Sequence, residues 1–208
     1  MEILAVFYAA LGYLALVSAS LCGLLFMGDG TMLSLMDGMG GFAPRQTLWI
    51  DLALLVCMTA LHTSVSHGLM RAVSDGLIPK RLERGTQAWV SGAVLLVLYA
   101  FWQPLPQIVW TWHEPLQWIA SALFYLGGTL IFMGILAKHW DMFPTSRVQP
   151  LQGGILMAVW GTSIMSLGHL LLACTVSAYL LLDAVWSLYK DAHEREAPAG
   201  SPSLRIPY

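Results

Sequence analysis

Long apolar runs recur along almost the whole chain, and their length limits what the chain can fold into. A helix needs about 20 apolar residues to cross a bilayer core about 30 Å thick. Such runs predict membrane spans at about 4–27, 48–66, 86–102 and 117–137. Only 11% of the 208 residues are charged, against about 25% in a soluble domain. We therefore expect an all-α integral membrane protein.

The last apolar run extends from Gly153 to Leu188 and is too long for one ordinary span. Small, turn-prone residues interrupt its middle, which predicts a tight helical hairpin and brings the count to about six transmembrane helices. The interrupting residues are Gly161, Thr162, Ser163, Ser166, Gly168 and His169.

The distribution of basic residues predicts the orientation. With six spans and a cytoplasmic N-terminus, all Lys and Arg residues except Arg45 fall in cytoplasmic segments, as the positive-inside rule requires. With five spans the C-terminal tail moves outside and the asymmetry weakens. We therefore expect both termini in the cytoplasm, one transmembrane domain over 1–190, and a polar cytoplasmic tail over 191–208.

Charge and cysteine content restrict the partners. A net charge of −2 gives no basic surface for nucleic acid, so the expected partners are membrane lipids and other membrane protein subunits. We expect a multi-pass protein of the bacterial inner membrane. Cys22, Cys57 and Cys174 lie inside apolar runs without a CxxC pair, which is typical of small core residues rather than disulfides or a metal site.

Tryptophan gathers between the third and fourth predicted spans. Four Trp side chains there predict an aromatic belt at the outer membrane interface. They are Trp102, Trp110, Trp112 and Trp118.

A few polar residues within or beside the spans could carry chemistry. His62, His139 and His169 are candidate axial ligands of a haem or of a chlorophyll-type pigment, because an intramembrane histidine is a functional hypothesis by default. The alternative is a hydrogen-bonded interfacial or core side chain, and no spacing pairs these histidines as a haem site requires. Asp183, the only charge in the last run, should find a hydroxyl or amide partner or carry a proton.

Six short motifs occur in a characteristic order. They are LHTSVSHGLM (61–70), PKRLER (79–84), WQPLPQIVW (102–110), KHWDMF (138–143), MSLGH (165–169) and AYLLL (178–182). In this order and spacing the chain resembles the membrane-embedded methanethiol S-methyltransferases, which are relatives of isoprenylcysteine carboxyl methyltransferase. The resemblance implies a multi-span helical fold whose C-terminal helices hold S-adenosylmethionine near the cytoplasmic face and pass its methyl group to a small thiol.

The cofactor motif of that family departs from its pattern here. The family has Arg-His-Pro-x-Tyr-x-Gly after a cytoplasmic loop; Pro150 and Gly154 match it, whereas Val148, Gln149 and Gln152 replace the Arg, the His and the Tyr. Ser187 and Leu188 stand where the resemblance places a Glu-Glu pair. These replacements remove charged and aromatic groups that would fix the cofactor.

The motif losses favour a pseudoenzyme, a non-catalytic protein with the methyltransferase fold and no bound cofactor. Its expected role is that of a structural or accessory subunit of a larger membrane complex, such as a photosynthetic reaction centre with its antenna or a respiratory assembly. In that interpretation no residue is catalytic. The alternatives are a small-thiol S-methyltransferase with a diverged S-adenosylmethionine site, and a haem- or pigment-binding membrane protein.

Overall fold

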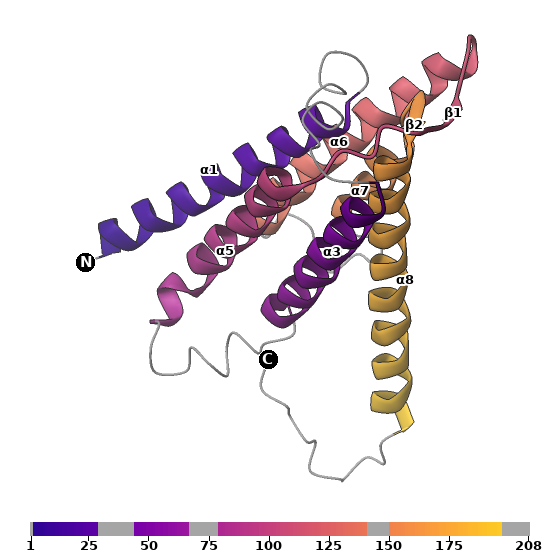
Figure 1. The fold of residues 1–208 in the computed structure, drawn as a ribbon. Coiled ribbons are helices and arrows are strands. Elements are labelled where there is room, and N and C mark those ends of the chain that lie inside the picture. Colours follow the sequence, from indigo (N-terminus) through magenta and orange to yellow (C-terminus); the bar gives the residue numbers. More distant parts are fainter. Residues whose placement is uncertain (1, 29–43, 67–78, 141–149, 197–208) are drawn as a thin grey trace.

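Helices dominate the computed structural model, which describes residues 2–28, 44–66, 79–140 and 150–196. The elements within those ranges are α1 (Glu2–Met27), α3 (Pro44–Ser66), α5 (Lys80–Phe101), β1 (Ile108–Thr111), α6 (Leu116–Trp140), α7 (Pro150–Trp160), β2 (Ile164–Ser166) and α8 (Leu167–Glu196) (Figure 1). Helices α1, α6 and α8 each contain an apolar stretch long enough to cross a membrane. The prediction of a helical membrane protein is confirmed at this level.

The interruption in the last apolar run is also confirmed, since the helix ends at Trp160 and a new one begins at Leu167. The 11 residues of α7 rise about 16 Å, roughly half of a bilayer core. Six complete crossings and cytoplasmic termini therefore stay predictions. Helix α8 continues to Glu196, six residues past the predicted start of the tail, because Lys, Ala, Glu and Arg there favour helix.

Two short strands were not expected in an all-α fold. The segments IVWT and IMS contain the β-branched and aromatic residues that favour strands. They pair antiparallel, with Trp110 opposite Met165 and Thr111 opposite Ile164. The pairing ties the segment between α5 and α6 to the break between α7 and α8 (Figure 1). We call this end of the helix assembly the strand end.

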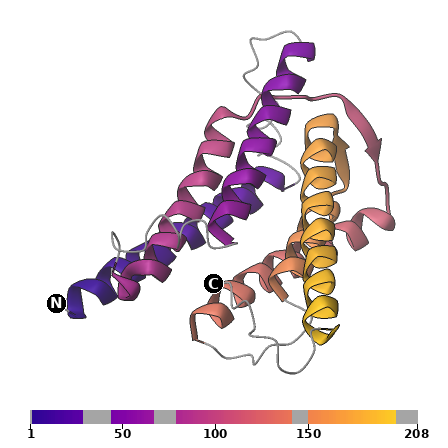
Figure 2. The same ribbon diagram turned by 90° about the horizontal axis from the view of Figure 1, so that it is seen from below.

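Helices α1 and α5 run in parallel and approach closely through glycine. A methyl group added at Gly12 would lie 2.7 Å from the Gly85 carbonyl oxygen, and one at Gly92 would lie 3.3 Å from Leu16 Cα. Both views show the two helices side by side (Figures 1 and 2). Small residues of this kind allow membrane helices to pack backbone against backbone.

Helices α6 and α7 form a second glycine-mediated pair, which is antiparallel. A methyl group at Gly154 would lie 2.8 Å from both the Gly127 carbonyl oxygen and the Ile131 backbone nitrogen. One at Gly134 would lie 2.9 Å from Leu151 Cα. In Figure 2, α6 and α8 lie on one side of the molecule, and α1, α3 and α5 lie on the other.

The buried apolar residues join these groups. Leu55, Leu98, Trp102 and Leu172 form a core cluster between α3, α5 and α8. The predicted aromatic belt therefore needs correction: Trp102 is 7% exposed and belongs to the core, whereas Trp112 and Trp118 face outward.

The cysteines also differ from expectation. All three are free, as predicted, but Cys22, Cys57 and Cys174 are exposed rather than buried in the core. The outer faces of membrane helices contact lipid and are as apolar as the core, so an apolar run in the sequence does not separate the two environments.

Candidate functional site

The described part of the cofactor motif lies in the first turns of α7. Pro150 begins the helix, where its missing N–H costs no intrahelical hydrogen bond. Gly154 is buried against α6. The two positions that match the family motif therefore also have plain structural uses, namely helix initiation and close packing. Val148 and Gln149 lie outside the described residues.

Gln152 connects the motif to the last helix. Its Nε2 donates a hydrogen bond of 3.3 Å to Asp183 Oδ2 in a partly buried setting. The expectation that Asp183 finds an amide partner is confirmed. The pair brings the position that replaces the motif tyrosine into contact with a carboxylate on α8, more than two helical turns beyond the core cluster. We call this the motif end of the assembly.

Asp183 also bears on the missing acidic pair. Ser187 lies four residues after Asp183, so the two side chains share one face of α8, one turn apart. Ser187 Oγ donates to the Ala184 carbonyl oxygen of its own helix at 2.8 Å, and Leu188 is 68% exposed. A carboxylate is therefore present on this face of α8, one turn nearer to α7 than the resemblance places it.

Aromatic side chains follow on the exposed surface of α8. Trp186 and Tyr189 are stacked, with ring centroids 5.8 Å apart and an interplanar angle of 21°. Tyr189 also contacts the His193 ring, with the centroids 4.2 Å apart. This row begins three residues after Asp183 and offers exposed ring faces to a planar ligand or to the membrane interface.

The three histidine candidates lie on three different helices. His169 is buried at the strand end, where its Nε2 lies 2.9 Å from the Val159 carbonyl oxygen. Since a carbonyl only accepts, Nε2 carries the hydrogen in this bond. Ser166 Oγ accepts from the His169 backbone N–H at 3.2 Å and caps α8. His169 thus links the end of α7 to the start of α8.

The other two candidates lie in different helices, His62 near the end of α3 and His139 in the last turn of α6. Within the described ranges no group of three or more His, Cys, Asp and Glu side chains could hold a metal ion. Haem or pigment ligation stays a prediction for all three histidines.

Sequence reasoning missed Asp51, which is fully buried in α3 near the strand end. Its Oδ1 accepts a 2.8 Å hydrogen bond from the Gln103 backbone N–H, just after α5. The signal was available, because Asp51 is the only charged residue of the predicted span 48–66.

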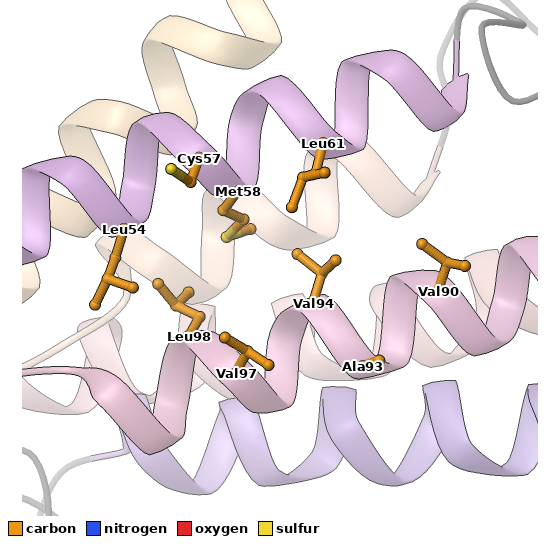
Figure 3. Close-up of a pocket in the computed structure, with 9 residues that line it drawn as sticks. All are labelled: Leu54, Cys57, Met58, Leu61, Val90, Ala93, Val94, Val97 and Leu98. Carbon is orange, nitrogen blue, oxygen red and sulfur yellow. The ribbon is translucent and has the colours of Figure 1, made fainter.

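An apolar groove of about 250 Å³ lies between α3 and α5. Figure 3 shows side chains of the two helices, among them Met58 and Val94, pointing toward one another across it. Among the described residues that line it, the side chains are apolar apart from the weakly polar thiol of Cys57. The described lining is therefore suited to an apolar guest.

Comparison with known proteins confirms the resemblance found in the motifs. The chain is 24% identical to the methanethiol S-methyltransferase of Mycobacterium tuberculosis in an alignment of 205 positions, gaps included, that covers 86% of this chain and 84% of that protein. It is 28% identical to the Pseudomonas sp. methanethiol S-methyltransferase in a gapped alignment of 216 positions, with coverage of 86% and 83%. For methanethiol S-methyltransferase 2 of Bradyrhizobium diazoefficiens the identity is 24%, with coverage of 84% and 77%. No family model and no solved structure matches the chain.

Proposed function

We propose that this relative of the methanethiol S-methyltransferases is an S-adenosylmethionine-dependent S-methyltransferase acting on a small thiol. The similarity to enzymes of that name over most of the chain supports methyl transfer more than it supports the pseudoenzyme interpretation. The proposal includes a diverged cofactor site at the motif end, on the cytoplasmic side of a bacterial inner membrane.

The observation that carries this proposal is the hydrogen bond between Gln152 and Asp183. It places an amide and a carboxylate where the motif helix meets the last helix. S-adenosylmethionine presents an ammonium group, two ribose hydroxyls and an adenine amino group, all of which donate hydrogen bonds to a carboxylate or an amide oxygen. A charged acceptor gives a stronger bond than a neutral one. Asp183 therefore supplies a negative charge on the face of α8 that also holds Ser187, one of the two positions where the resemblance places an acidic residue.

The proposed methyl transfer has few steps. The thiol loses its proton, its sulfur forms a bond to the donor methyl carbon, and the bond from that carbon to the sulfonium sulfur breaks. The products are a methyl thioether and S-adenosylhomocysteine, and the thiol proton is released to water. Such a transfer depends chiefly on alignment and exclusion of water, so it requires few charged side chains. A site that holds the donor by Gln152 and Asp183 meets this requirement.

The test is an assay of the purified full-length protein in detergent with S-adenosylmethionine and methanethiol, followed by gas chromatography of dimethyl sulfide. We expect product from the wild-type protein. In Asp183→Asn we expect roughly tenfold or greater loss of donor affinity, because a hydrogen bond to a charged group contributes about 1.5–3 kcal/mol. Donor binding is measured separately by isothermal titration.

The control is Thr129→Ala, which removes an exposed hydroxyl on α6 that donates to the Tyr125 carbonyl oxygen of its own helix. This variant should bind the donor and turn over like the wild type. A wild-type protein that neither binds S-adenosylmethionine nor forms dimethyl sulfide would overturn the proposal.

A second candidate function is the non-catalytic accessory subunit. It is favoured by one observation, the replacement of the motif Arg, His and Tyr by Val148, Gln149 and Gln152. Recovery from mild detergent decides between the two. Stoichiometric association with subunits of a larger complex, without donor binding, supports the scaffold; isolation as a single species that binds S-adenosylmethionine eliminates it.

A further inference from the structure

Two buried polar groups lie at the junction of α3, α5 and α8 without a hydrogen-bond partner among the residues that the structure describes. They are Asp51 Oδ2, an acceptor, and Trp102 Nε1, a donor. Asp51 is 0% exposed and Trp102 is 7% exposed. Buried polar groups in folded proteins are nearly always hydrogen-bonded, so a pair of this kind requires an explanation.

The two groups belong to one neighbourhood. Asp51 Oδ1 accepts from the backbone N–H of Gln103, the residue that follows Trp102. Four residues after Asp51, Leu55 packs with Trp102 in the core cluster. The indole nitrogen of Trp102 lies 3.6 Å from where a methyl group at Gly168 would stand. Asp51 is therefore bonded to the residue that follows Trp102, and the Trp102 indole nitrogen lies beside the first turn of α8.

Asp51 Oδ2 and Trp102 Nε1 have complementary hydrogen-bonding requirements. The carboxylate oxygen needs a donor, the indole N–H needs an acceptor, and neither finds one in the described protein. An apolar guest would satisfy neither group. A molecule with one O–H or S–H group satisfies both, because it donates through its hydrogen and accepts through its lone pairs. Ordered waters commonly fill this role at buried polar sites.

We propose that a single small neutral molecule with one O–H or S–H group binds at this junction, accepting from Trp102 Nε1 and donating to Asp51 Oδ2. The shared chemistry is an O–H or S–H group on a small body, so the source is either water or a small thiol. The site lies at the strand end and is distinct from the Gln152–Asp183 pair at the motif end.

The test uses the full-length protein in detergent. Infrared difference spectra follow the Asp51 carboxyl band, assigned by its loss in Asp51→Asn, and Raman spectra follow the indole N–H band, assigned by its loss in Trp102→Phe. We expect Trp102→Phe to shift the Asp51 band, and Asp51→Asn to move the Trp102 indole band toward its position without a hydrogen bond. If Trp102→Phe does not shift the Asp51 band and Asp51→Asn does not shift the Trp102 band, the two groups share no guest and the proposal fails.

Two further measurements identify the guest. Bound water contributes an O–H stretching band that moves in H₂¹⁸O and disappears in Asp51→Asn. A bound thiol instead makes the indole band of Trp102 shift when ethanethiol is added to the protein. If neither change occurs while the two bands remain uncoupled, the junction holds no guest.

Trp110→Phe is the matched control. Its Nε1 is likewise buried without a partner among the described residues, but Trp110 belongs to β1 and not to the α3–α5–α8 junction. This variant should leave the Asp51 band in place. If Trp102→Phe does not fold, Asp51→Asn in the Trp110→Phe background still decides, since it must move one indole band.

Discussion

The two ends of α7 are held in different ways. At the strand end, the Val159 carbonyl oxygen bonds buried His169 Nε2 at 2.9 Å, and Trp160 Nε1 donates to Ser177 Oγ at 2.9 Å. At the motif end, the partly buried bond from Gln152 to Asp183 is longer, at 3.3 Å. The first end is fixed by short bonds, one of them inside the core. The second is held by a hydrogen bond between an amide and a carboxylate, and a ligand could replace that bond by bonding to either group.

The comparison of the two ends holds only if α7 is packed rigidly against α6. Gly154→Ala tests this packing and has the largest expected effect. The added methyl would lie 2.8 Å from two backbone atoms of α6, which cannot rotate away. Overpacking of this kind costs about 1–3 kcal/mol or more. We expect a clear loss of monodisperse protein after heating, measured by size-exclusion chromatography.

Gly153→Ala is its neighbouring control, because a methyl group there would meet nothing within 4 Å. Replacing glycine by alanine in an open helical position stabilises by about 0.5–1 kcal/mol. Equal thermal behaviour of the two variants would show that α6 and α7 are not packed through Gly154.

The contrast between the ends predicts that His169→Ala acts on stability and not on donor binding. Removing the imidazole leaves the buried Val159 carbonyl oxygen without its bond, which costs about 1–3 kcal/mol. We expect a lower melting temperature with unchanged donor affinity in the folded fraction. His169→Gln, which keeps an N–H donor, should restore part of the loss. A large fall in S-adenosylmethionine affinity in the folded His169→Ala protein would show that the strand end does affect donor binding at the motif end.

A smaller effect should appear when a carboxylate is moved along α8. Ser187→Asp in the Asp183→Asn background returns an acid to the same face one turn away. We expect recovery of several-fold in S-adenosylmethionine affinity, measured by titration, with thermal stability unchanged because Ser187 is exposed. Val185→Asp, at an exposed position on a different face of α8, is the control and should not recover binding.

The least effect is expected from the loss of an exposed hydroxyl on α6. Thr129→Ala removes a bond to the Tyr125 carbonyl oxygen of its own helix. Surface changes of this kind stay within about 0.5 kcal/mol. A thermal shift assay should detect no change, and a measurable one would indicate that this face of α6 contacts another molecule.

The apolar runs were sufficient to predict most helices, because burial in hydrocarbon demands a length that the sequence displays. The break at 161–166 was likewise visible in its small polar residues. The strands were not, since IVWT stands in a segment whose tryptophans resemble an interfacial belt. Which Trp side chain faces the core depends on the partner helix. The Trp102 contact with Leu172 joins residues far apart in the chain, and no local pattern encodes it.

The candidate site was predictable only in part. Asp183 was recognisable as a single carboxylate in an apolar run, and the need for a hydroxyl or amide partner, or for a proton, followed from the cost of an unpaired charge. That the partner is Gln152 required the antiparallel packing of α7 on α8. Asp51 was missed because it lies near the start of a predicted span, where a charged side chain can reach the membrane interface and is therefore not unusual.

The pairing of β1 with β2 imposes an order on biosynthesis. The ribosome releases Ile108–Thr111 before α6 and α7 are made, and Ile164–Ser166 after them. The bond from the Trp112 backbone N–H to the Ser163 carbonyl oxygen therefore closes only when both intervening helices are in place. A nascent chain stalled at Trp160 therefore holds an unpaired strand, and the motif end, which needs Asp183 of α8, is completed later still.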